Sequence, residues 1–326
     1  MESDVILKVE DLTVSFTTKR GVAKAVNKVN FELHKGDILG LVGESGCGKS
    51  VTSKSILKIL PPSITKMSGH IYYMGKDILS LDEKEMSQIR GHKISMIFQE
   101  PMVSLDPLFP VGNQLREVLM THTGMSKNEA ETKVLSMLKE VGIPSPEIRI
   151  NQYPFELSGG MRQRVMIAMG LLLHPDILIA DEPTTALDVT IQAQILQLLK
   201  DINQRFGTAI ILITHDLGVI AQCAHRVAVM YAGKIVEMAP TIHLFQKPLH
   251  PYTQGLLKSV PSMKKMEGML PSIPGVVPSI YDLPKGCAFC ARCPYAMDVC
   301  RQGEVPATAY PDRMVRCWKY GKGTSV

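Results

Sequence analysis

The sequence contains no apolar run that approaches the roughly 18 residues of a membrane-spanning helix. Its first residues, Met1–Asp4, lack the basic and apolar pattern of a signal peptide. The net charge is only +5 and no long basic run occurs, so nucleic acid is not indicated as a partner. Long heptad stretches are also missing. We therefore expect a globular cytosolic protein, and 326 residues predict about two domains.

The strongest local pattern is a glycine-rich loop between a predicted strand and a predicted helix. Ile38–Val42 has the composition of a buried parallel strand, and Ser50–Leu60 carries apolar residues at helical spacing. Between them, Gly43 to Ser50 fits G-x-x-x-x-G-K-[ST]. Glycines permit positive φ, and a helix N-terminus attracts phosphate through its N–H groups. The loop predicts nucleotide binding, with Lys49 on the β- and γ-phosphates and Ser50 on Mg²⁺.

The remaining elements predict an α/β fold around this loop. Val5–Phe31 interleaves apolar and polar residues, which indicates an antiparallel β layer. Ile94–Phe98 is a further strand that ends at Gln99. Val111–Val141 has apolar residues at a 3.6 period and a break at Thr123-Gly124, which predicts a helical insertion. We expect a P-loop NTPase core with an antiparallel β subdomain, a helical insertion and a small cysteine-rich C-terminal extension.

Two further strands carry polar residues to their carboxyl ends, where open α/β sheets bind ligands. Ile177–Ala180 is followed by Asp181 and Glu182. The two carboxylates can divide the work, with Asp181 on the metal and Glu182 polarising a water. Ala209–Ile213 leads to His215, and a lone histidine at a strand end is more often structural than functional. Its place at the same edge as the glycine-rich loop favours a functional role.

Two other candidates are weak when each is taken alone. Ser158 is a good helix cap, and Ser-Gly-Gly at a helix start presents a hydroxyl and N–H groups to an anion. The same tripeptide is more often a turn. Phe16 has the chemistry to stack on an adenine ring, but aromatic residues in strands usually pack in the core. From pattern alone, the core interpretation of Phe16 is favoured.

The order of the motifs resembles the ATP-binding subunit of an ABC transporter, from Val5 to about Met238. The resemblance is carried by the P-loop, Gln99 after a strand, the helical insertion and four stretches: Leu-Ser-Gly-Gly-Met-Arg-Gln-Arg from Leu157, Ile-Leu-Ile-Ala-Asp-Glu-Pro from Ile177, Ala186-Leu187-Asp188 and Thr214-His215-Asp216. Leu-Ser-Gly-Gly-x-x-Gln separates this family from other P-loop enzymes. In the family, two such subunits associate head to tail with ATP between them.

The resemblance assigns an ATP site that is shared with a partner. The phosphates would be cradled by Gly43, Glu44, Ser45, Gly46, Cys47, Gly48, Lys49, Ser50 and Val51. Phe16 stands where the family has an aromatic residue under adenine, usually Tyr, which reverses the interpretation from pattern alone. Ser158 and Gly160 would touch the γ-phosphate of the ATP that the partner holds.

The resemblance also implies the catalytic roles. Ser50, Gln99 and Asp181 would support Mg²⁺, and Glu182 would be the general base. His215 would hold the γ-phosphate. Asp188 would lie at the dimer interface, and Gln99 with the helical insertion would report nucleotide state to membrane subunits.

The sequence after Met238 changes character and narrows the resemblance. His250-Pro-Tyr and the stretch from Gln99 to Pro107 resemble the D-type ATP-binding subunit of oligopeptide and dipeptide importers. Nickel importers of the same group share these features. The expected division is a cassette over 1–238, with a helical subdomain over about 101–165, and an extension over 239–326.

Five of the seven cysteines lie between Cys287 and Cys317, and in a reducing compartment such clustering favours metal over disulfides. Cys-x₂-Cys-x₂-Cys from Cys287 is typical of a [4Fe–4S] cluster, and four thiolates also suit zinc. D-type subunits have Gly-Cys-x₅-Cys-x₆-Cys and a later Cys that bind [4Fe–4S]. That resemblance selects Cys287, Cys293, Cys300 and Cys317, and it leaves Cys290 as an extra thiol, although local spacing alone would include it.

The sequence therefore predicts an ATPase that powers import of dipeptides or oligopeptides from the cytoplasmic face of the membrane. Its implied partners are a second, paralogous ATP-binding subunit, two membrane permease subunits and an extracytoplasmic substrate-binding protein. One alternative is a nickel-import ATPase. Two others are a soluble ABC ATPase working on DNA or ribosomes, and a redox or regulatory protein that acts through its cysteines.

Overall fold

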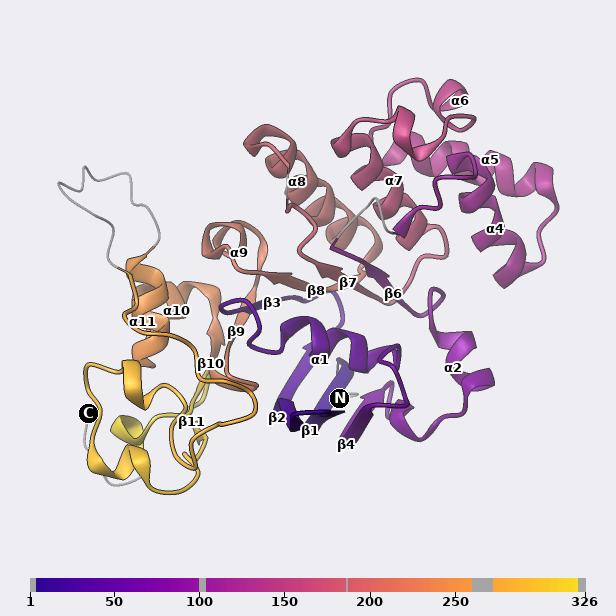
Figure 1. The fold of residues 1–326 in the computed structure, drawn as a ribbon. Helices are drawn as coiled ribbons and strands as arrows, with labels where there is room; N and C mark the ends of the chain where they lie inside the picture. Colours follow the sequence, from indigo (N-terminus) through magenta and orange to yellow (C-terminus); the bar gives the residue numbers. More distant parts are fainter. Residues whose placement is uncertain (1–3, 100–103, 186, 260–271, 322–326) are drawn as a thin grey trace. The chain divides into compact units, whose positions relative to one another are not determined.

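The computed structural model describes residues 4–99, 104–185, 187–259 and 272–321 (Figure 1). The chain forms two compact units. The first consists of Met1–His34, Ile38–Ser80 and Ile213–Val326, and the second of Lys35–Asp37 and Leu81–Leu212. Among the motifs named above, Ala186 and the segment 100–103 lie outside the described residues.

The first unit contains the antiparallel β layer that the sequence predicts. Its strand order is β2-β1-β4-β5, formed by β1 (Val5–Thr18), β2 (Gly21–His34), β4 (Thr65–Tyr73) and β5 (Lys76–Asp77). Val9 on β1 lies opposite Phe31 on one side and Ile71 on the other, and all three side chains are buried. These apolar rows give the layer its core face.

The glycine-rich loop of the first unit lies between a strand and a helix, as predicted. β3 (Ile38–Val42) is buried at every position and pairs in parallel with β9 (Arg226–Tyr231). The helix α1 (Lys49–Ile56) follows the loop. It ends four residues before the expected Leu60, because Lys58 takes a left-handed conformation with φ 51° that a helix does not continue.

The C-terminal part of the first unit continues from β9. β10 (Lys234–Pro240) pairs antiparallel with β9 and with β12 (Met314–Val315), which in turn pairs with β11 (Thr308–Ala309). The other elements are α9 (Leu217–Cys223), α10 (Thr241–Gln246), α11 (Pro251–Lys258) and the 3₁₀ turns η1 (Ile78–Ser80), η3 (Cys290–Arg292), η4 (Asp298–Arg301) and η5 (Trp318–Tyr320). The yellow segments lie beside α10 and α11 in Figure 1.

The second unit contains the helical insertion. Its helices are α2 (Glu83–Ile89), α4 (Val111–Thr123), α5 (Lys127–Glu140), α6 (Pro146–Arg149), α7 (Gly159–Leu171) and α8 (Val189–Phe206), with the 3₁₀ turn η2 (Pro154–Glu156). Leu115 and Leu119 on α4, and Val134 and Leu138 on α5, are buried at the predicted spacing. Gly124, in a left-handed conformation, ends α4 at the predicted break.

The strands of the second unit deliver the predicted polar residues. β6 (Ile94–Ile97) pairs in parallel with β7 (Ile177–Asp181), and both are largely buried. β8 (Ala209–Thr214) begins in this unit, and its last two residues belong to the first. No helix within the described ranges has the length and apolar character needed to cross a bilayer.

Candidate functional site: a glycine-rich loop and a paired glutamate

The glycine-rich loop requires glycine at two positions for steric reasons. Gly43 has φ 154°, and a Cβ there would lie 2.2 Å from the carbonyl oxygen of Met230. Gly48 has φ 108°, and a Cβ there would lie 2.6 Å from the carbonyl oxygen of Ala25. Both approaches are far shorter than a van der Waals contact, so any larger residue would displace the loop.

Lys49 lies across the loop rather than toward solvent. Lys49 is only 6% exposed to solvent. The ammonium donates to the carbonyl oxygens of Gly43 at 2.7 Å and Glu44 at 3.1 Å. The N-terminus of α1, where the positive end of the helix dipole lies, follows the loop directly. Gly48 has no side chain to cap it, so the first N–H groups of the helix receive no side-chain cap at this position. A loop with this geometry can hold a phosphate chain against backbone N–H groups and one lysine.

Residues of the C-terminal extension contact the glycine-rich loop within the first unit. Arg292 donates to both carboxylate oxygens of Glu44, at 2.7 and 3.0 Å, and the Arg292 side chain is 5% exposed. The hydroxyl of Tyr252 accepts the N–H of Glu44 at 2.9 Å. Tyr252 is the tyrosine of His250-Pro-Tyr, but nothing in the spacing of Arg292 or Tyr252 indicated a contact with the loop.

An aromatic cluster supports these contacts. The ring of Tyr231 lies 4.6 Å from that of Tyr252 and 5.2 Å from that of Phe289. Burial raises the pKa of the Tyr252 phenol well above its usual range, so the hydroxyl remains neutral. The cluster places Arg292 over the Tyr231 ring, at 5.8 Å from its centroid.

In the second unit, Gln99 and Glu182 lie together at the ends of neighbouring parallel strands. The side-chain amide of Gln99 donates to Oε2 of Glu182 at 3.0 Å, and the hydroxyl of Thr185 donates to the same oxygen at 2.9 Å. Asp181, the last residue of β7, is 3% exposed. Glu182 has φ 49°, a left-handed conformation that costs a non-glycine residue about 1–3 kcal/mol. The sequence did not indicate Thr185.

The Ser-Gly-Gly segment is a helix start, as predicted. The Ser158 hydroxyl accepts the N–H of Met161 at 3.3 Å and caps α7. A Cβ on Gly160 would lie 2.9 Å from Cγ2 of Ile191, so α8 packs closely there. Asp188 caps α8 by accepting the N–H of Ile191 at 3.0 Å.

Two more predicted residues lie in the first unit. Phe16 is half-buried on β1, opposite Ala23 of β2 and Thr65 of β4, so it is not a fully buried core residue. His215 is exposed and follows β8 directly, before the Asp216 cap of α9.

The cysteines of the extension gather around a cavity of about 20 Å³ that is lined by Cys287, Cys290, Cys293, Cys300 and Cys317, among others. Burial, and then the neighbouring thiols of Cys300, Cys317 and Cys293, raise the pKa of Cys287 to about 12. Burial likewise raises the pKa of the Cys293 and Cys317 thiols. Across the described residues, no three His, Cys, Asp or Glu side chains are arranged to hold a metal ion as they stand.

Comparisons with known proteins agree with this geometry. A family model described as "ABC transporter" matches residues 26–185, and one described as "Oligopeptide/dipeptide transporter, C-terminal region" matches residues 236–300. The dipeptide transport ATP-binding protein DppD of Bacillus subtilis (strain 168) is 54% identical over 96% of this chain and 94% of its own length. The oligopeptide transport ATP-binding protein OppD of Salmonella typhimurium (strain LT2) is 49% identical over 97% of this chain and 94% of its own.

The similarity extends to a solved structure. A dimeric post-hydrolysis state of the ATP-binding cassette MJ0796, bound to ADP and Pi, matches with a TM-score of 0.65. It is 29% identical and covers 72% of this chain and 98% of its own. The chain therefore belongs to the ABC transporter family, in the branch of the oligopeptide and dipeptide transport ATP-binding proteins.

Proposed function

We propose that this chain is the ATP-hydrolysing subunit that powers import of dipeptides or oligopeptides. The observation that carries the proposal is the orientation of Glu182, whose Oε2 accepts hydrogen bonds from Gln99 and Thr185 beside the buried Asp181. A carboxylate held in this way is a general base with a fixed direction. The near-50% identity to peptide transport ATP-binding proteins supports the choice of cargo.

The proposed reaction is hydrolysis of the bond between the β- and γ-phosphates. Glu182 takes a proton from a water as the water oxygen attacks the γ-phosphorus, and ADP and phosphate leave. The ammonium of Lys49, which donates to two loop carbonyl oxygens in this structure, turns to the β- and γ-phosphates. The backbone N–H groups between Gly43 and Val51 cradle the phosphate chain. Positioning and charge neutralisation thus do most of the catalysis.

Mg²⁺ fits the donor set that the family motifs assign to Ser50, Gln99 and Asp181. A hydroxyl, an amide oxygen and a carboxylate are the hard oxygen ligands that Mg²⁺ prefers. The bound ion would neutralise charge on the phosphates. Because Gln99 donates to Glu182 through its NH₂ group, the amide oxygen remains to serve as the ligand.

The remaining roles follow the family pattern and complete the proposed ATP site. Phe16 stacks on adenine, and His215 holds the γ-phosphate. Ser158 and Gly160 contact the ATP of the partner subunit, and Asp188 lies at that interface. The proposed division is a cassette over 1–238, with its helical subdomain over about 101–165, and an extension over 239–326.

We further propose that Cys287, Cys293, Cys300 and Cys317 hold a [4Fe–4S] cluster. The thiols of the other three raise the pKa of Cys287, and Cys290 lines the same cavity and acts on the thiol of Cys293. The donor set fits iron and also zinc, since either would replace the protons of four clustered thiols. Anaerobic purification followed by iron, sulfide and zinc assays tests this. A colourless protein with one zinc per chain would replace the cluster with zinc.

The proposed assembly contains a paralogous ATP-binding subunit, two membrane permeases and an extracytoplasmic substrate-binding protein, with this chain on the cytoplasmic face. The decisive experiment reconstitutes that assembly in vesicles and measures ATPase stimulation by the binding protein loaded with dipeptide, oligopeptide or nickel. Stimulation by peptide is expected. Stimulation by nickel alone would establish the nickel importer instead.

A further inference from the structure

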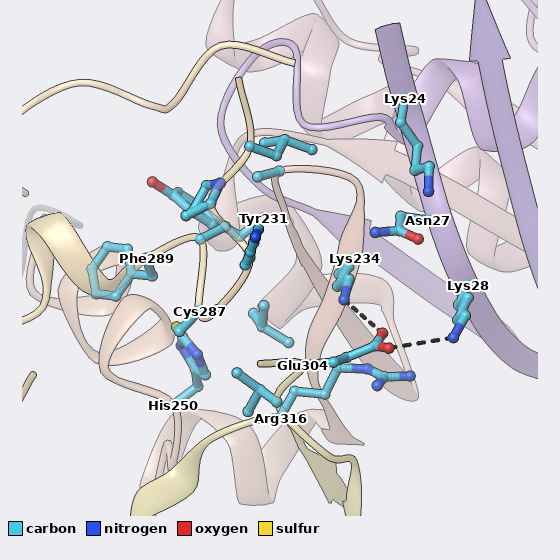
Figure 2. Close-up of a pocket in the computed structure, with 18 residues that line it drawn as sticks. Lys24, Asn27, Lys28, Tyr231, Lys234, His250, Cys287, Phe289, Glu304 and Arg316 are labelled. Atoms are coloured by element: carbon cyan, nitrogen blue, oxygen red, sulfur yellow. Dashed lines mark hydrogen bonds and ion pairs between the residues drawn. The ribbon is translucent and has the colours of Figure 1, made fainter. Parts of the chain in front are cut away.

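A second cavity, of about 270 Å³, lies in the first unit (Figure 2), and none of its lining residues belongs to the glycine-rich loop from Gly43 to Ser50. It is bordered by β2, by β10 and the turn before it, and by several segments of the extension. Its walls include Lys24, Lys28, Tyr231, Ala232, Lys234, Val236, Lys285, Phe289, Glu304, Val305 and Arg316. The volume is close to the lower end of the range for small-molecule pockets.

The charges around this cavity are strongly unbalanced. Five cationic side chains line it (Lys24, Lys28, Lys234, Lys285 and Arg316), against the single carboxylate of Glu304. Glu304 pairs with Lys234 at 2.8 Å and with Lys28 at 3.3 Å. These two lysines lower the pKa of Glu304 to about 2, so it is ionised at neutral pH. Even so, one carboxylate neutralises only part of the positive charge.

Arg316 is a partly buried cation of this cavity. Its Nε is buried and has no hydrogen-bond partner. The backbone N–H of Arg316 donates to Val236 at 2.8 Å and fixes the residue next to β10. Arg316 is only partly buried, and a guanidinium that lines a cavity is suited to bind an incoming anion through charge-assisted hydrogen bonds.

The opposite side of the cavity has a different character. Tyr231 and Phe289 lie there, away from the cluster of Lys24, Lys28 and Lys234 in Figure 2. His250 is also on this side and is neutral, because burial lowers its pKa to about 3. The cavity thus has a cationic end and an aromatic end.

We propose that this cavity binds a small organic polyanion, with two or more phosphate or carboxylate groups at the Arg316 and Lys24 end. The apolar or planar part of the ligand lies against Tyr231 and Phe289. The volume selects a metabolite rather than a macromolecule.

The cavity is connected to the phosphate-binding loop through one turn. Ala232 lines the cavity, and the next residue, Gly233, donates its N–H to the carbonyl oxygen of Cys47 at 2.9 Å. Gly233 in turn accepts the N–H of Asn27, another lining residue, at 2.8 Å. A ligand that restrains this turn therefore also restrains the loop around Cys47. This regulatory consequence rests on the proposed function, whereas ligand binding itself does not.

The test must separate this cavity from the loop, which also attracts phosphate. Lys49→Ala removes the lysine of the loop, and the full-length chain with that substitution is titrated by calorimetry with pyrophosphate and, separately, with citrate, in 150 mM salt without Mg²⁺. Both probes are expected to bind. Adding Arg316→Gln should weaken binding at least about tenfold, since hydrogen bonds to charged groups are the strong ones. Lys24→Gln should also weaken binding of the probes, and because Lys24 is exposed this substitution should not disturb folding.

Lys66→Gln is the matched control, because Lys66 is an exposed lysine on β4 outside the cavity. Equal losses in Lys66→Gln and Arg316→Gln would show nonspecific charge attraction and overturn the proposal. If neither pyrophosphate nor citrate bound, the proposal would be overturned as well. Binding only to phosphatidylglycerol vesicles, lost in Arg316→Gln, would assign the surface to a lipid headgroup and exclude a soluble ligand. In the wild-type chain, citrate should change the affinity for ATP; unchanged affinity would remove the regulatory link alone.

Discussion

At the scale of single residues, the proposed catalysis depends on how Glu182 is held. Its left-handed backbone is unfavourable, and two neutral donors fix one of its oxygens. Strain of this kind persists only where the surrounding structure compensates for it, and it is concentrated at functional sites. The geometry thus favours one orientation of the carboxylate over many.

We expect Glu182→Gln to retain ATP binding and to lose hydrolysis by at least about 100-fold, because the amide cannot accept the proton of the attacking water. The variant is assembled with its partner subunits, and nucleotide affinity and single-turnover hydrolysis are measured separately. Near-normal turnover would remove Glu182 from the role of base.

Thr185→Val removes one of the two donors to Glu182 and keeps the shape of the side chain. We expect kcat to fall about tenfold, as for a lost positioning hydrogen bond, with KM for ATP nearly unchanged. Thr185→Ser, which retains the hydroxyl, should preserve the rate. If serine and valine gave the same rate, the hydroxyl would have no positioning role.

At the scale of elements, the extension and the glycine-rich loop are joined through two short contacts. Arg292 lies in the turn η3 between Cys290 and Cys293, and Tyr252 lies in the first turn of α11. Both bind Glu44, one at its carboxylate and one at its N–H. A change in the conformation of the cysteine-rich segment would therefore alter the contacts that hold Glu44 in the glycine-rich loop.

We expect Arg292→Gln to lower the free energy of unfolding by about 1.5–3 kcal/mol, the usual contribution of a hydrogen bond to a charged group. ATP affinity should fall about tenfold, because Glu44 loses its bidentate partner. A double-mutant cycle with Glu44→Gln, read by fluorescent nucleotide titration, should show strong coupling. Arg301→Gln, at an exposed position in the next turn, is the matched control. Additive effects of the Glu44 and Arg292 substitutions would contradict the link.

His250 makes the N-terminus of α11 sensitive to pH. Its Nδ1 accepts the N–H of Tyr252 at 3.0 Å, and burial lowers its pKa to about 3. Between pH 6.5 and about 3 the unfolded chain binds a proton that the folded chain does not, so stability must fall as the pH falls through this window. His250→Asn keeps a capping side chain that does not titrate.

As the pH decreases from 7 to 4, the free energy of unfolding measured in urea should therefore fall more for the wild type than for His250→Asn. Glu237, whose pKa is raised by burial, is present in both proteins, so its contribution cancels. A difference that does not depend on pH would mean that His250 is not held neutral.

At the scale of the whole molecule, the proposed site is completed only by a second subunit. Ser158 caps α7 at an exposed position, which is where a phosphate of a partner's ATP would arrive in a head-to-tail dimer. The isolated chain should then bind ATP and hydrolyse it very slowly, because the groups that complete the site come from a second subunit.

We expect Ser158→Arg to leave ATP binding by the isolated chain unchanged, since the substitution lies outside its own glycine-rich loop. In the assembled transporter, hydrolysis at the partner's site should fall by more than about tenfold because the arginine blocks the sandwich. Ser158→Thr retains the cap and should retain most activity. Loss of ATP binding by the isolated Ser158→Arg chain would place Ser158 in its own site instead.

The sequence alone determined the parts of this protein that depend on short-range patterns. An apolar run, two glycines and Lys-Ser define the phosphate loop, because only glycine permits the backbone of Gly43 and Gly48. The 3.6 period of α4 and α5 and the caps at Ser158 and Gly124 likewise act over a few neighbouring residues. Such signals are local, so they can be read without coordinates.

Only the tertiary structure decided which distant residues meet. Arg292 lies 248 residues after Glu44 and binds it in a partly buried ion pair. Arg316 and Lys24 line one cavity only because β10 and β2 belong to the same packed unit. Charges and aromatic rings carry no sequence periodicity that identifies their partners. Burial and desolvation, which make these contacts strong, arise only when the chain is packed.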